Sequence, residues 1–508
     1  MAEVIIRDLR DWLNEVEKIG QLKRVGQEVD PKLEMGALTY MNGKNPGHPT
    51  LLFEKPKGHN GPFKVLFNPI GNSIDRLSLA MRAKPGRKPL ELVEYLKDIF
   101  ASDKKMIPPK FVDAKDAPIY ENEWTGNKID MTSLPTPMHW PRDGGDYIGT
   151  ADAIITKDPE SGRVNLGTYR QMVEGKARVG YYSSPGKDTL LDREKWWAKG
   201  EPCPVVSVYG LDPLLFICAA TGFPKMDSEY DYAGGINGAP IEVVKGKVTG
   251  LPIPARAEVV IEGFAYPNQG QAEGPFGEFT GYYGRPGHEQ TPYIEVKAVY
   301  FRNNPTMTAA LMADTPGCNE QSLFLGMLRG VRIWSDLESC GIPGIKGVWG
   351  PPEAAGGFGM TVVSMKQMYA GHAQQAAAIA AQCAGGAYYS KFIYIVDEDI
   401  DPSNLEEVIW AASTRCRCSD DIDILRNTWS TYLDPSKNPN SDRPWGSKAL
   451  IYACKEQKNI DKFALRTALT KEQYAHAVAR WQELGMHGVP PSLRFFDDLT
   501  VKAAAAGK

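Results

Sequence analysis

Two glutamates stand five residues apart in the stretch EGPFGEFTGYYG, residues 273–284, on either side of a Gly-Pro turn. Phe276, Phe279 and two tyrosines flank them in the sequence. A carboxyl group pressed against an apolar wall favours its neutral form and holds its proton to a higher pH than a solvated one. Glu273 and Glu278 are therefore a candidate acid pair for proton transfer, with a pair of solvated surface charges as the alternative.

Two close carboxylates need a cation between them unless one stays protonated. Arg170, within NLGTYRQMVEGK, is a candidate for that cation, and a surface arginine on a β-ribbon is the alternative. A third polar cluster contains Asp227, Glu229 and Asp231 beside several glycines. Its carboxylates suit a hard cation, although a solvated acidic turn would have the same composition.

Phosphate-binding motifs are sparse in this chain. It has no GxxxxGK[ST] motif and no GxGxxG after a predicted strand, which argues against a nucleoside triphosphatase and a Rossmann dehydrogenase. The stretch YYSSPGKDT, residues 181–189, has the serine, glycine and lysine of a turn that holds one phosphate through backbone N–H groups.

The composition is that of a globular protein of two or three domains. The 508 residues carry a formal net charge of -4 and contain no long basic tract, so nucleic acid is not an expected partner. The start of the chain lacks the pattern of a signal peptide, and no apolar run is long enough to span a membrane, so we expect a cytoplasmic protein. The eight scattered cysteines fit neither a disulfide framework nor a zinc site.

The elements that must position these side chains follow from hydrophobic spacing. Residues 9–19 have helical periodicity, with Asp8 and Gly20 as the caps. A Pro-rich passage, residues 130–147, can be neither a long helix nor an inner strand. After it, alternating runs such as Ile294 to Tyr300 predict an antiparallel, barrel-like sheet, and the last third alternates strands and helices. Ser403 and Glu406 have capping-box spacing at the start of one such helix.

The clusters and their order resemble the UbiD family of reversible decarboxylases, which use prenylated FMN. The matching pieces are NLGTYRQMVEGK, SEYDYAGGINGAPIEVVKG, AEVVIEG, EGPFGEFTGYYG and KFIYIVDEDIDPSNLEEVIWAASTRCR, which run in family order from about residue 150 to 418. The resemblance implies an α/β (α+β) fold with an N-terminal α/β segment over 1–110 and a split β-barrel flavin-binding domain over 111–322. A connecting helix over 323–345 and a C-terminal α/β oligomerisation domain over 346–508 would complete it.

The resemblance also implies the site residues. Arg170, Glu273 and Glu278 would be the catalytic network, in which Glu278 donates the proton, Glu273 tethers Arg170, and Arg170 orients the substrate carboxylate. A divalent metal, Mn²⁺ or similar, would bridge the flavin phosphate, and a K⁺ ion would lie near the backbone carbonyls of Ala220, Thr221 and Phe223. The implied cofactor-binding residues are Asn165, Thr168, Tyr169, Arg170, Ser183, Lys187 and Lys391, and the implied metal ligands are Asn165 and Glu229.

One departure from the family pattern concerns the metal. Many members have a histidine after the arginine segment, whereas this chain has none between His139 and His288. Asp188, water or a backbone oxygen is the expected substitute, and a site for a different ion is the alternative. The resemblance implies decarboxylation of an aromatic or α,β-unsaturated acid by a homo-oligomer, dimeric or hexameric, which receives its cofactor from a flavin prenyltransferase. Three alternatives stay open: a phthaloyl-CoA-like thioester decarboxylase, a carboxylase of a phenol or arene, and a non-catalytic subunit.

Overall fold

The computed structural model describes residues 2–101, 106–184, 186–223, 227–437 and 444–498. The chain divides into two compact units. Helix α8 (Ser322–Ser339) begins in the first and ends in the second. The four-part division expected from the sequence, with boundaries at 110, 322 and 345, stays a prediction. The first unit comprises Met1–Leu328, Pro352–Phe358 and Tyr432–Arg443, and the second comprises Arg329–Pro351, Gly359–Thr431 and Pro444–Lys508.

The first helix, α1 (Leu9–Lys18), begins where the sequence predicts. The Asp8 side chain accepts a hydrogen bond from the N–H of Asp11 and thereby satisfies one of the free donors of the first turn. Gly20 has a φ of 72°, the left-handed conformation in which glycine commonly follows a helix end. Both predicted caps are confirmed.

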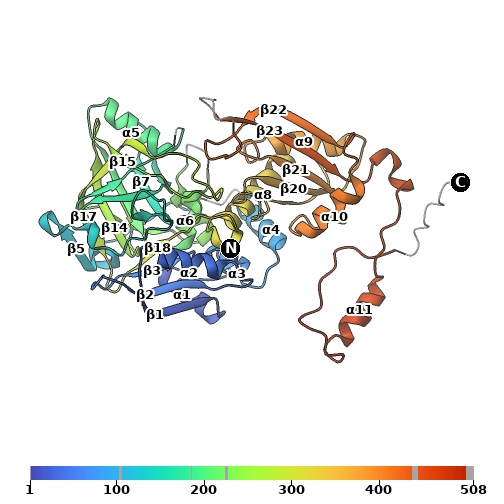
Figure 1. The fold of residues 1–508 in the computed structure, drawn as a ribbon, viewed down its shortest axis with the longest axis horizontal. Helices are drawn as coiled ribbons and strands as arrows, with labels where there is room; N and C mark the ends of the chain where they lie inside the picture. Colours follow the sequence, from blue (N-terminus) through green and yellow to red (C-terminus); the bar gives the residue numbers. More distant parts are fainter. Residues whose placement is uncertain (1, 102–105, 185, 224–226, 438–443, 499–508) are drawn as a thin grey trace. The chain divides into compact units, whose positions relative to one another are not determined.

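The N-terminal sheet has the order β1-β2-β3-β18, and its fourth strand comes from far along the chain. Strand β18 pairs in parallel with β3, so that Thr306 lies opposite Lys64. Figure 1 shows α1, α2 and α3 beside this sheet. The elements are β1 (Leu22–Val29), β2 (Thr50–Pro56), β3 (Lys64–Phe67), β18 (Thr306–Ala309), α2 (Glu34–Gly43), α3 (Ile74–Ala80) and α4 (Pro89–Ala101).

A nine-stranded sheet with the main order β6-β9-β10-β17-β14-β11-β7-β8 dominates the first unit, and β5 also pairs with β17. Every pairing in it is antiparallel, as the sequence predicts, and the sheet curls (Figure 1). The strands are β5 (Asn122–Thr125), β6 (Tyr147–Gly149), β7 (Asp152–Lys157), β8 (Val164–Gly167), β9 (Gln171–Gly175), β10 (Arg178–Gly180), β11 (Cys203–Tyr209), β14 (Val259–Ala265) and β17 (Tyr293–Phe301).

The alternation expected in β17 is present in the core. Ile294, Val296, Ala298 and Tyr300 are buried, while the residues between the first three are partly exposed. Two smaller sheets, of order β13-β12-β4 and β15-β16, belong to the same unit, and α5, α6 and α7 pack against strands of the large sheet. The bounds are β4 (Lys110–Phe111), β12 (Glu242–Lys245), β13 (Pro252–Pro254), β15 (Gln271–Glu273), β16 (His288–Thr291), α5 (Asp188–Ala198), α6 (Pro213–Ala220) and α7 (Glu229–Asn237).

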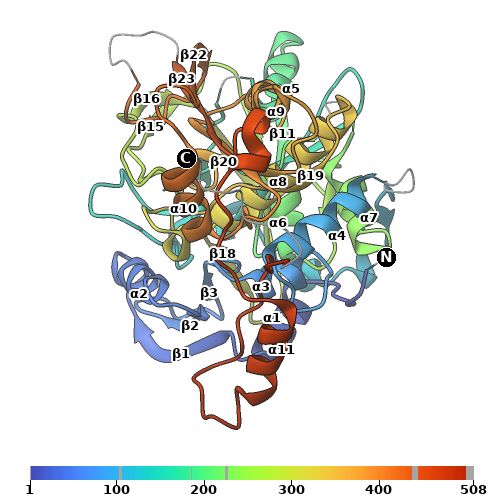
Figure 2. The same cartoon turned by 90° about the vertical axis from the view of Figure 1, so that its right-hand side faces the viewer.

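The second unit contains a five-stranded mixed sheet of order β19-β20-β21-β23-β22. Helices α9 and α10 pack against β23, and Figures 1 and 2 show them on opposite faces of the sheet. The elements are β19 (Ile345–Trp349), β20 (Met360–Met365), β21 (Phe392–Asp397), β22 (Ile422–Trp429), β23 (Trp445–Ala453), α9 (His372–Gln382), α10 (Leu405–Arg415) and α11 (Lys471–Arg480).

The predicted cap of α10 is wrong by one residue. Asn404, rather than Ser403, is the N-cap, and its side chain accepts hydrogen bonds from the N–H groups of Glu406 and Glu407. The hydroxyl of Ser403 instead donates to the carboxylate of Asp401 at 2.7 Å, so it is engaged before the helix begins.

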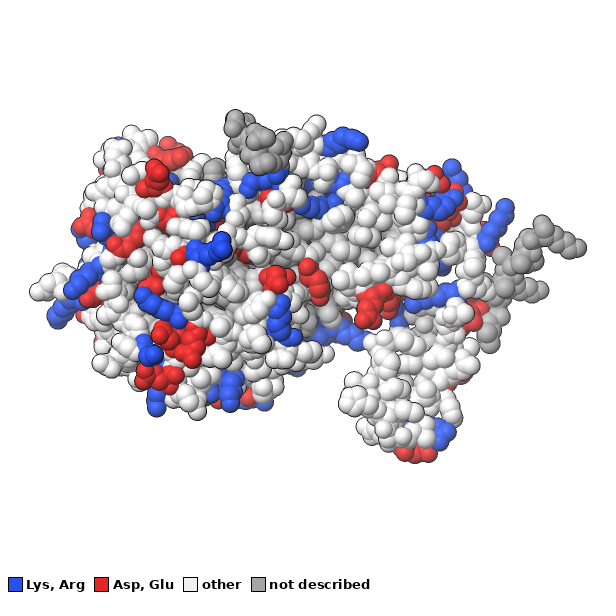
Figure 3. Space-filling model, in the orientation of Figure 1, with Lys and Arg blue, Asp and Glu red and all other residues white. Residues whose placement is uncertain are grey.

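Charged side chains of both signs are interspersed over the face that Figure 3 shows. This mixture agrees with the small net charge and with the absence of a basic tract in the sequence. Within the described ranges, no helix combines the length and the hydropathy that a membrane crossing requires.

Glu258 ties three parts of the first unit together. Its carboxylate is fully buried and accepts hydrogen bonds from Arg10 on α1, from Arg302 after β17, and from the N–H of Thr306 at the start of β18. A carboxylate with this many donors compensates charges that would otherwise be buried without a partner.

We expect Glu258→Gln to destabilise the first unit by about 3 kcal/mol, because a neutral amide removes a buried counter-ion of Arg302. The measurement is the midpoint of urea-induced unfolding. Glu295→Gln is the control, since Glu295 pairs with Lys297 at the surface and should cost less than about 1 kcal/mol. Equal effects of the two substitutions would contradict this role of Glu258.

Candidate active site

The structure brings Arg170, Glu273 and Glu278 into one cluster. Arg170 lies in the turn between β8 and β9, Glu273 ends β15, and Glu278 follows in the Gly-Pro turn. The Arg170 Nε and Nη2 atoms donate to the two oxygens of Glu273 at 2.9 and 2.8 Å, and Nη1 donates to Glu278 Oε1 at 2.5 Å. The guanidinium is thus shared between both carboxylates, as the acid-pair interpretation requires.

Glu278 combines burial with a single strong donor. Burial raises the pKa of Glu278 above the ordinary value, while Arg170 opposes the rise and the charge of Glu273 adds to it. Phe276 and Phe279 of the same turn are buried and provide the apolar wall expected from the sequence. A glutamate in this setting retains a proton at a higher pH than a solvated one and can act as a general acid.

Glu273 has a second partner that the sequence analysis did not identify. The hydroxyl of Tyr147, the first residue of β6, donates to Glu273 Oε1 at 2.8 Å and lies 3.4 Å from the Pro275 carbonyl oxygen. Tyr147 is fully buried and its ring packs against Phe276, with centroids 4.5 Å apart. Glu273 thus accepts three hydrogen bonds, two from N–H groups of Arg170 and one from the hydroxyl of Tyr147.

A stacked pair covers the face of the guanidinium. The Arg170 Cζ atom lies 4.7 Å from the centroid of the Tyr182 ring, which in turn stacks on His288 with centroids 4.8 Å apart. His288 stands opposite Glu273 in the β15–β16 pair. Burial lowers the pKa of His288, and the charge of Arg170 lowers it further, so that the neutral imidazole is favoured. A neutral ring adds no competing positive charge beside Arg170.

The predicted metal ligands Asn165 and Glu229 lie next to each other, both buried. Glu229 Oε2 accepts the N–H of Leu166, the residue after Asn165, at 2.8 Å. Burial raises the pKa of Glu229 to about 7. Arg163, which the sequence analysis passed over, contacts both Glu229 and Asp188 at 3.4 Å. Among the described residues, no group of three or more Asp, Glu, His or Cys side chains is arranged to hold a metal ion.

Two of the predicted flavin-binding residues, Thr168 and Tyr169, have side chains that contact other parts of the protein. The Thr168 hydroxyl donates to the Asp152 carbonyl oxygen at 3.0 Å, and the Tyr169 ring packs against a core cluster around Ile154 and Tyr181. The side chains of these two residues therefore have partners inside the protein.

Ser183 and Lys187 are the predicted flavin-binding residues whose polar side-chain atoms are available to a ligand. The Ser183 hydroxyl is buried and has no hydrogen-bond partner in the described part of the chain. The side chain of Lys187 is exposed, and desolvation lowers the pKa of its ammonium group. An anionic group bound there would satisfy both.

Four predicted residues remain: Lys391, Ala220, Thr221 and Phe223. Lys391 precedes β21 and belongs to the second unit, where its N–H donates to the Gly359 carbonyl oxygen at 3.0 Å. Ala220 and Thr221 are at the C-terminal end of α6, where helix carbonyl groups lack amide partners, and Phe223 stacks on Tyr232. The roles of these four residues stay predictions.

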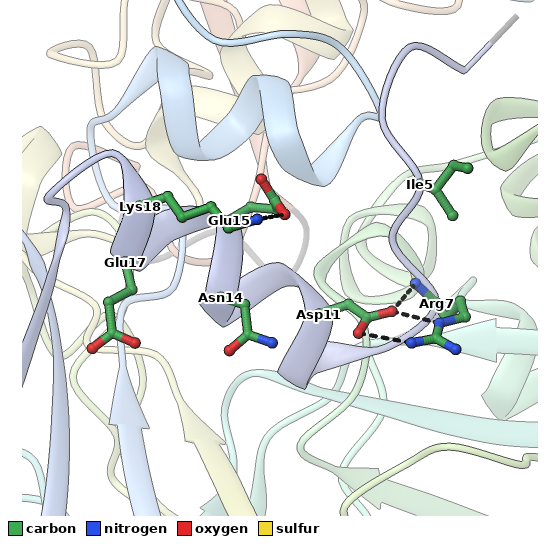
Figure 4. Close-up of a pocket in the computed structure, with 7 residues that line it drawn as sticks. All are labelled: Ile5, Arg7, Asp11, Asn14, Glu15, Glu17 and Lys18. Carbon is green, nitrogen blue, oxygen red and sulfur yellow. Dashed lines mark hydrogen bonds and ion pairs between the residues drawn. The ribbon is translucent and has the colours of Figure 1, made fainter.

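A surface hollow on α1 has no part in this cluster. Two ion pairs line this hollow, Arg7 with Asp11 and Lys18 with Glu15, as Figure 4 shows. Its charges largely compensate one another, so the hollow offers little to a charged ligand. Its lining residues are Ile5, Arg7, Asp11, Asn14, Glu15, Glu17 and Lys18.

Comparison with protein families gives three matches in chain order. Residues 13–96 match the N-terminal domain of 3-octaprenyl-4-hydroxybenzoate carboxy-lyase, residues 110–315 its Rift-related domain, and residues 322–453 its C-terminal domain. These matches cover far more than half of the chain and confirm the predicted fold class of two α/β regions around a split barrel.

Solved structures of decarboxylases are similar over nearly the whole chain. The open form of vanillic acid decarboxylase from Sedimentibacter hydroxybenzoicus has a TM-score of 0.84 at 28% identity and covers 94% of this chain and 100% of its own. The UbiD-class enzyme HmfF from Pelotomaculum thermopropionicum, in complex with FMN, has a TM-score of 0.81 at 28% identity, covering 91% and 97%.

The apo 3,4-dihydroxybenzoic acid decarboxylase of Klebsiella pneumoniae has a TM-score of 0.81 at 25% identity, covering 91% of this chain and 97% of its own. All three domains of the chain match the same family, and the arginine shared by two carboxylates lies on this fold. Both findings lead to the same family. The chain belongs to the UbiD family of carboxy-lyases.

Proposed function

We propose that this carboxy-lyase removes CO₂ from an aromatic or α,β-unsaturated carboxylic acid with the help of prenylated FMN. The proposal rests on one observation: the two glutamates that share Arg170 differ in the hydrogen bonds that they accept. Glu273 accepts three hydrogen bonds from Arg170 and Tyr147, whereas Glu278 accepts one from Arg170 and has a raised pKa. One acid is thus held as a counter-ion while the other can carry a proton.

Arg170 is the group that would bind the substrate. A guanidinium has five N–H groups, and three of those on Arg170 donate to the glutamates, which leaves two for a substrate carboxylate. The buried guanidinium is fixed by both acids, so little side-chain entropy is lost when the substrate binds. Phe276 and Phe279 supply apolar surface for a planar substrate.

Glu278 would deliver the proton that replaces the carboxylate. Arg170 occupies Glu278 Oε1 at 2.5 Å, and Oε2 is the oxygen left to hold a proton. Burial raises the pKa of Glu278 above its ordinary value, so this acid keeps its proton to a higher pH than a solvated glutamate does.

The residues predicted to hold the flavin suit a phosphorylated cofactor. The unpartnered hydroxyl of Ser183 and the ammonium group of Lys187 lie on the segment that carries Tyr182, whose ring covers Arg170. Phosphate binding at this segment would place a cofactor beside the acid pair. When bound, prenylated FMN supplies the electron-accepting centre that loss of CO₂ requires, and the protein contributes binding, orientation and the proton.

Asn165 and Glu229 would bind a divalent ion, Mn²⁺ or similar, with Asp188 in place of the family's histidine. The carboxylates of Glu229 and Asp188 both contact Arg163, which would have to be displaced or shared when the ion binds. A K⁺ ion at the end of α6 and the phosphate-side role of Lys391 complete the proposed cofactor site.

The similar enzymes suggest the first substrates to test. Two of them are named for the decarboxylation of vanillic acid and of 3,4-dihydroxybenzoic acid. An evolved dimeric form of HmfF from Pelotomaculum thermopropionicum was solved in complex with prenylated FMN. A substrate screen should also include an α,β-unsaturated acid, a phthaloyl-CoA-like thioester and a phenol with bicarbonate. The protein for this screen is co-expressed with a flavin prenyltransferase. A homo-oligomer, dimer or hexamer, is the assembly we propose, and its size is read by light scattering.

Glu278→Gln should lower turnover by at least about 100-fold, because glutamine cannot donate a carboxylic proton in the reaction. The measurement is CO₂ release by the reconstituted enzyme, with cofactor content determined by absorbance and mass spectrometry. Glu289→Gln is the matched control, since Glu289 is an exposed glutamate of β16. Near-normal turnover of the Glu278→Gln variant would exclude Glu278 as the proton donor.

Arg170→Lys should reduce kcat/KM on the order of 100-fold, because an ammonium cannot bridge two carboxylates and a substrate at once. The flavin absorbance spectrum should change as well. Arg24→Lys, at a surface ion pair, serves as the control. Full activity together with an unchanged spectrum would remove Arg170 from the site.

The double variant Asn165→Ala, Glu229→Ala should lose bound divalent metal, which elemental analysis of the purified holoenzyme measures. The content should fall to less than about one tenth of that of the unaltered protein, because even the loss of a residue that only supports a metal ligand commonly costs about 10–100-fold in affinity. Unchanged metal content would refute the assignment of both ligands.

A further inference from the structure

Residues 134–147, the C-terminal part of the Pro-rich passage, pack against the turn that carries the acid pair. Three hydrogen bonds join the two: the Gly144 N–H donates to the Pro275 carbonyl oxygen at 2.8 Å, the Gly277 N–H donates to Asp143 Oδ1 at 3.0 Å, and the Tyr147 hydroxyl donates to Glu273 Oε1 at 2.8 Å. Each acid, or the residue before it, is thus attached to this segment.

Both carboxylate oxygens of Asp143 accept hydrogen bonds from backbone N–H groups. Its side chain is buried, and Oδ2 accepts the N–H of Trp140 at 2.9 Å while Oδ1 accepts that of Gly277. Burial raises the pKa of Asp143, and the N–H groups of Trp140, Gly277 and His139 oppose that rise. The carboxylate therefore links the segment's own backbone to the amide of Gly277, the residue before Glu278.

The backbones are in direct contact at this junction. A Cβ atom on Gly144 would lie 2.1 Å from the Gly274 carbonyl oxygen, and one on Gly277 would lie 2.5 Å from Trp140 Cδ1. Contacts this short leave no room for a side chain at either position. Trp140 is itself held by its indole N–H, which donates to the Met312 carbonyl oxygen at 3.0 Å.

We propose that Asp143 and Tyr147 are positioning residues that set the placement of the two glutamates around Arg170. The inference rests on the proposed function, because it assigns the segment a role in holding the proton donor. Asp143 acts on Glu278 through the Gly277 peptide, and Tyr147 acts on Glu273 through its hydroxyl. An acid that must deliver a proton to one carbon atom depends on such support, since small displacements reduce rates strongly.

The first test is hydrogen–deuterium exchange of the holoenzyme followed by mass spectrometry. Asp143→Asn and Tyr147→Phe should each raise deuterium uptake at least about twofold in peptides covering 274–281, where the Gly277 amide is bound to Asp143. Tyr120→Phe and Asp130→Asn are the controls, because they remove a tyrosine hydroxyl donating to the Lys245 carbonyl oxygen and a carboxylate accepting the Thr132 N–H.

The second test is the pH profile of kcat with the best substrate of the screen. Tyr147→Phe removes a donor from Glu273, so the negative charge acting on Glu278 increases, the pKa of Glu278 rises, and the alkaline limb of the profile moves to higher pH. We expect kcat to fall about tenfold in both variants, with cofactor content unchanged.

Unchanged deuterium uptake in both variants overturns the proposal, as does a pH profile that matches that of the controls. Tyr147→Phe removes a single oxygen atom, so its result decides the question even when Asp143→Asn does not fold. Failure of the proposed function is recognised separately, because the unaltered holoenzyme would then release no CO₂ while the exchange measurement still reports on the contact.

Discussion

The shared guanidinium of Arg170 is the interaction on which the site depends. A buried arginine between two carboxylates leaves one net negative charge in an apolar environment, and protonation of one acid removes it. The neighbours of the two glutamates differ: the Tyr147 hydroxyl donates a hydrogen bond to Glu273, whereas burial raises the pKa of Glu278.

The surrounding fold supplies what this pair cannot provide for itself. Arg170 comes from a turn of the large antiparallel sheet, the two acids from a hairpin outside it, and Tyr147 from the sheet's edge strand. No single element places the cluster, so its geometry depends on the packing of the whole first unit. Tyr182 closes one face of the guanidinium and lies on the segment of Ser183 and Lys187, which connects the acid chemistry to the proposed phosphate site.

The sequence predicted those features that local patterns encode. The caps of α1, the alternation in β17 and the antiparallel sheet follow from spacing, and the acid pair with its apolar wall follows from one short stretch. The sequence did not predict the roles of Tyr147, Asp143 and Arg163, because no local motif indicates their partners. These partners are Glu273, Gly277 and Glu229, which lie 126, 134 and 66 residues away in the chain. The parallel pairing of β18 with β3 was missed for the same reason.

That pairing has a consequence for how the chain folds during synthesis. Strand β18 begins at Thr306, and the N-terminal sheet that it completes starts at Leu22. The ribosome must therefore release more than half of the chain before this sheet gains its last strand. The first hundred residues do not form a finished domain that folds ahead of the rest, and their partly built edge needs protection from other chains until residues 306–309 emerge.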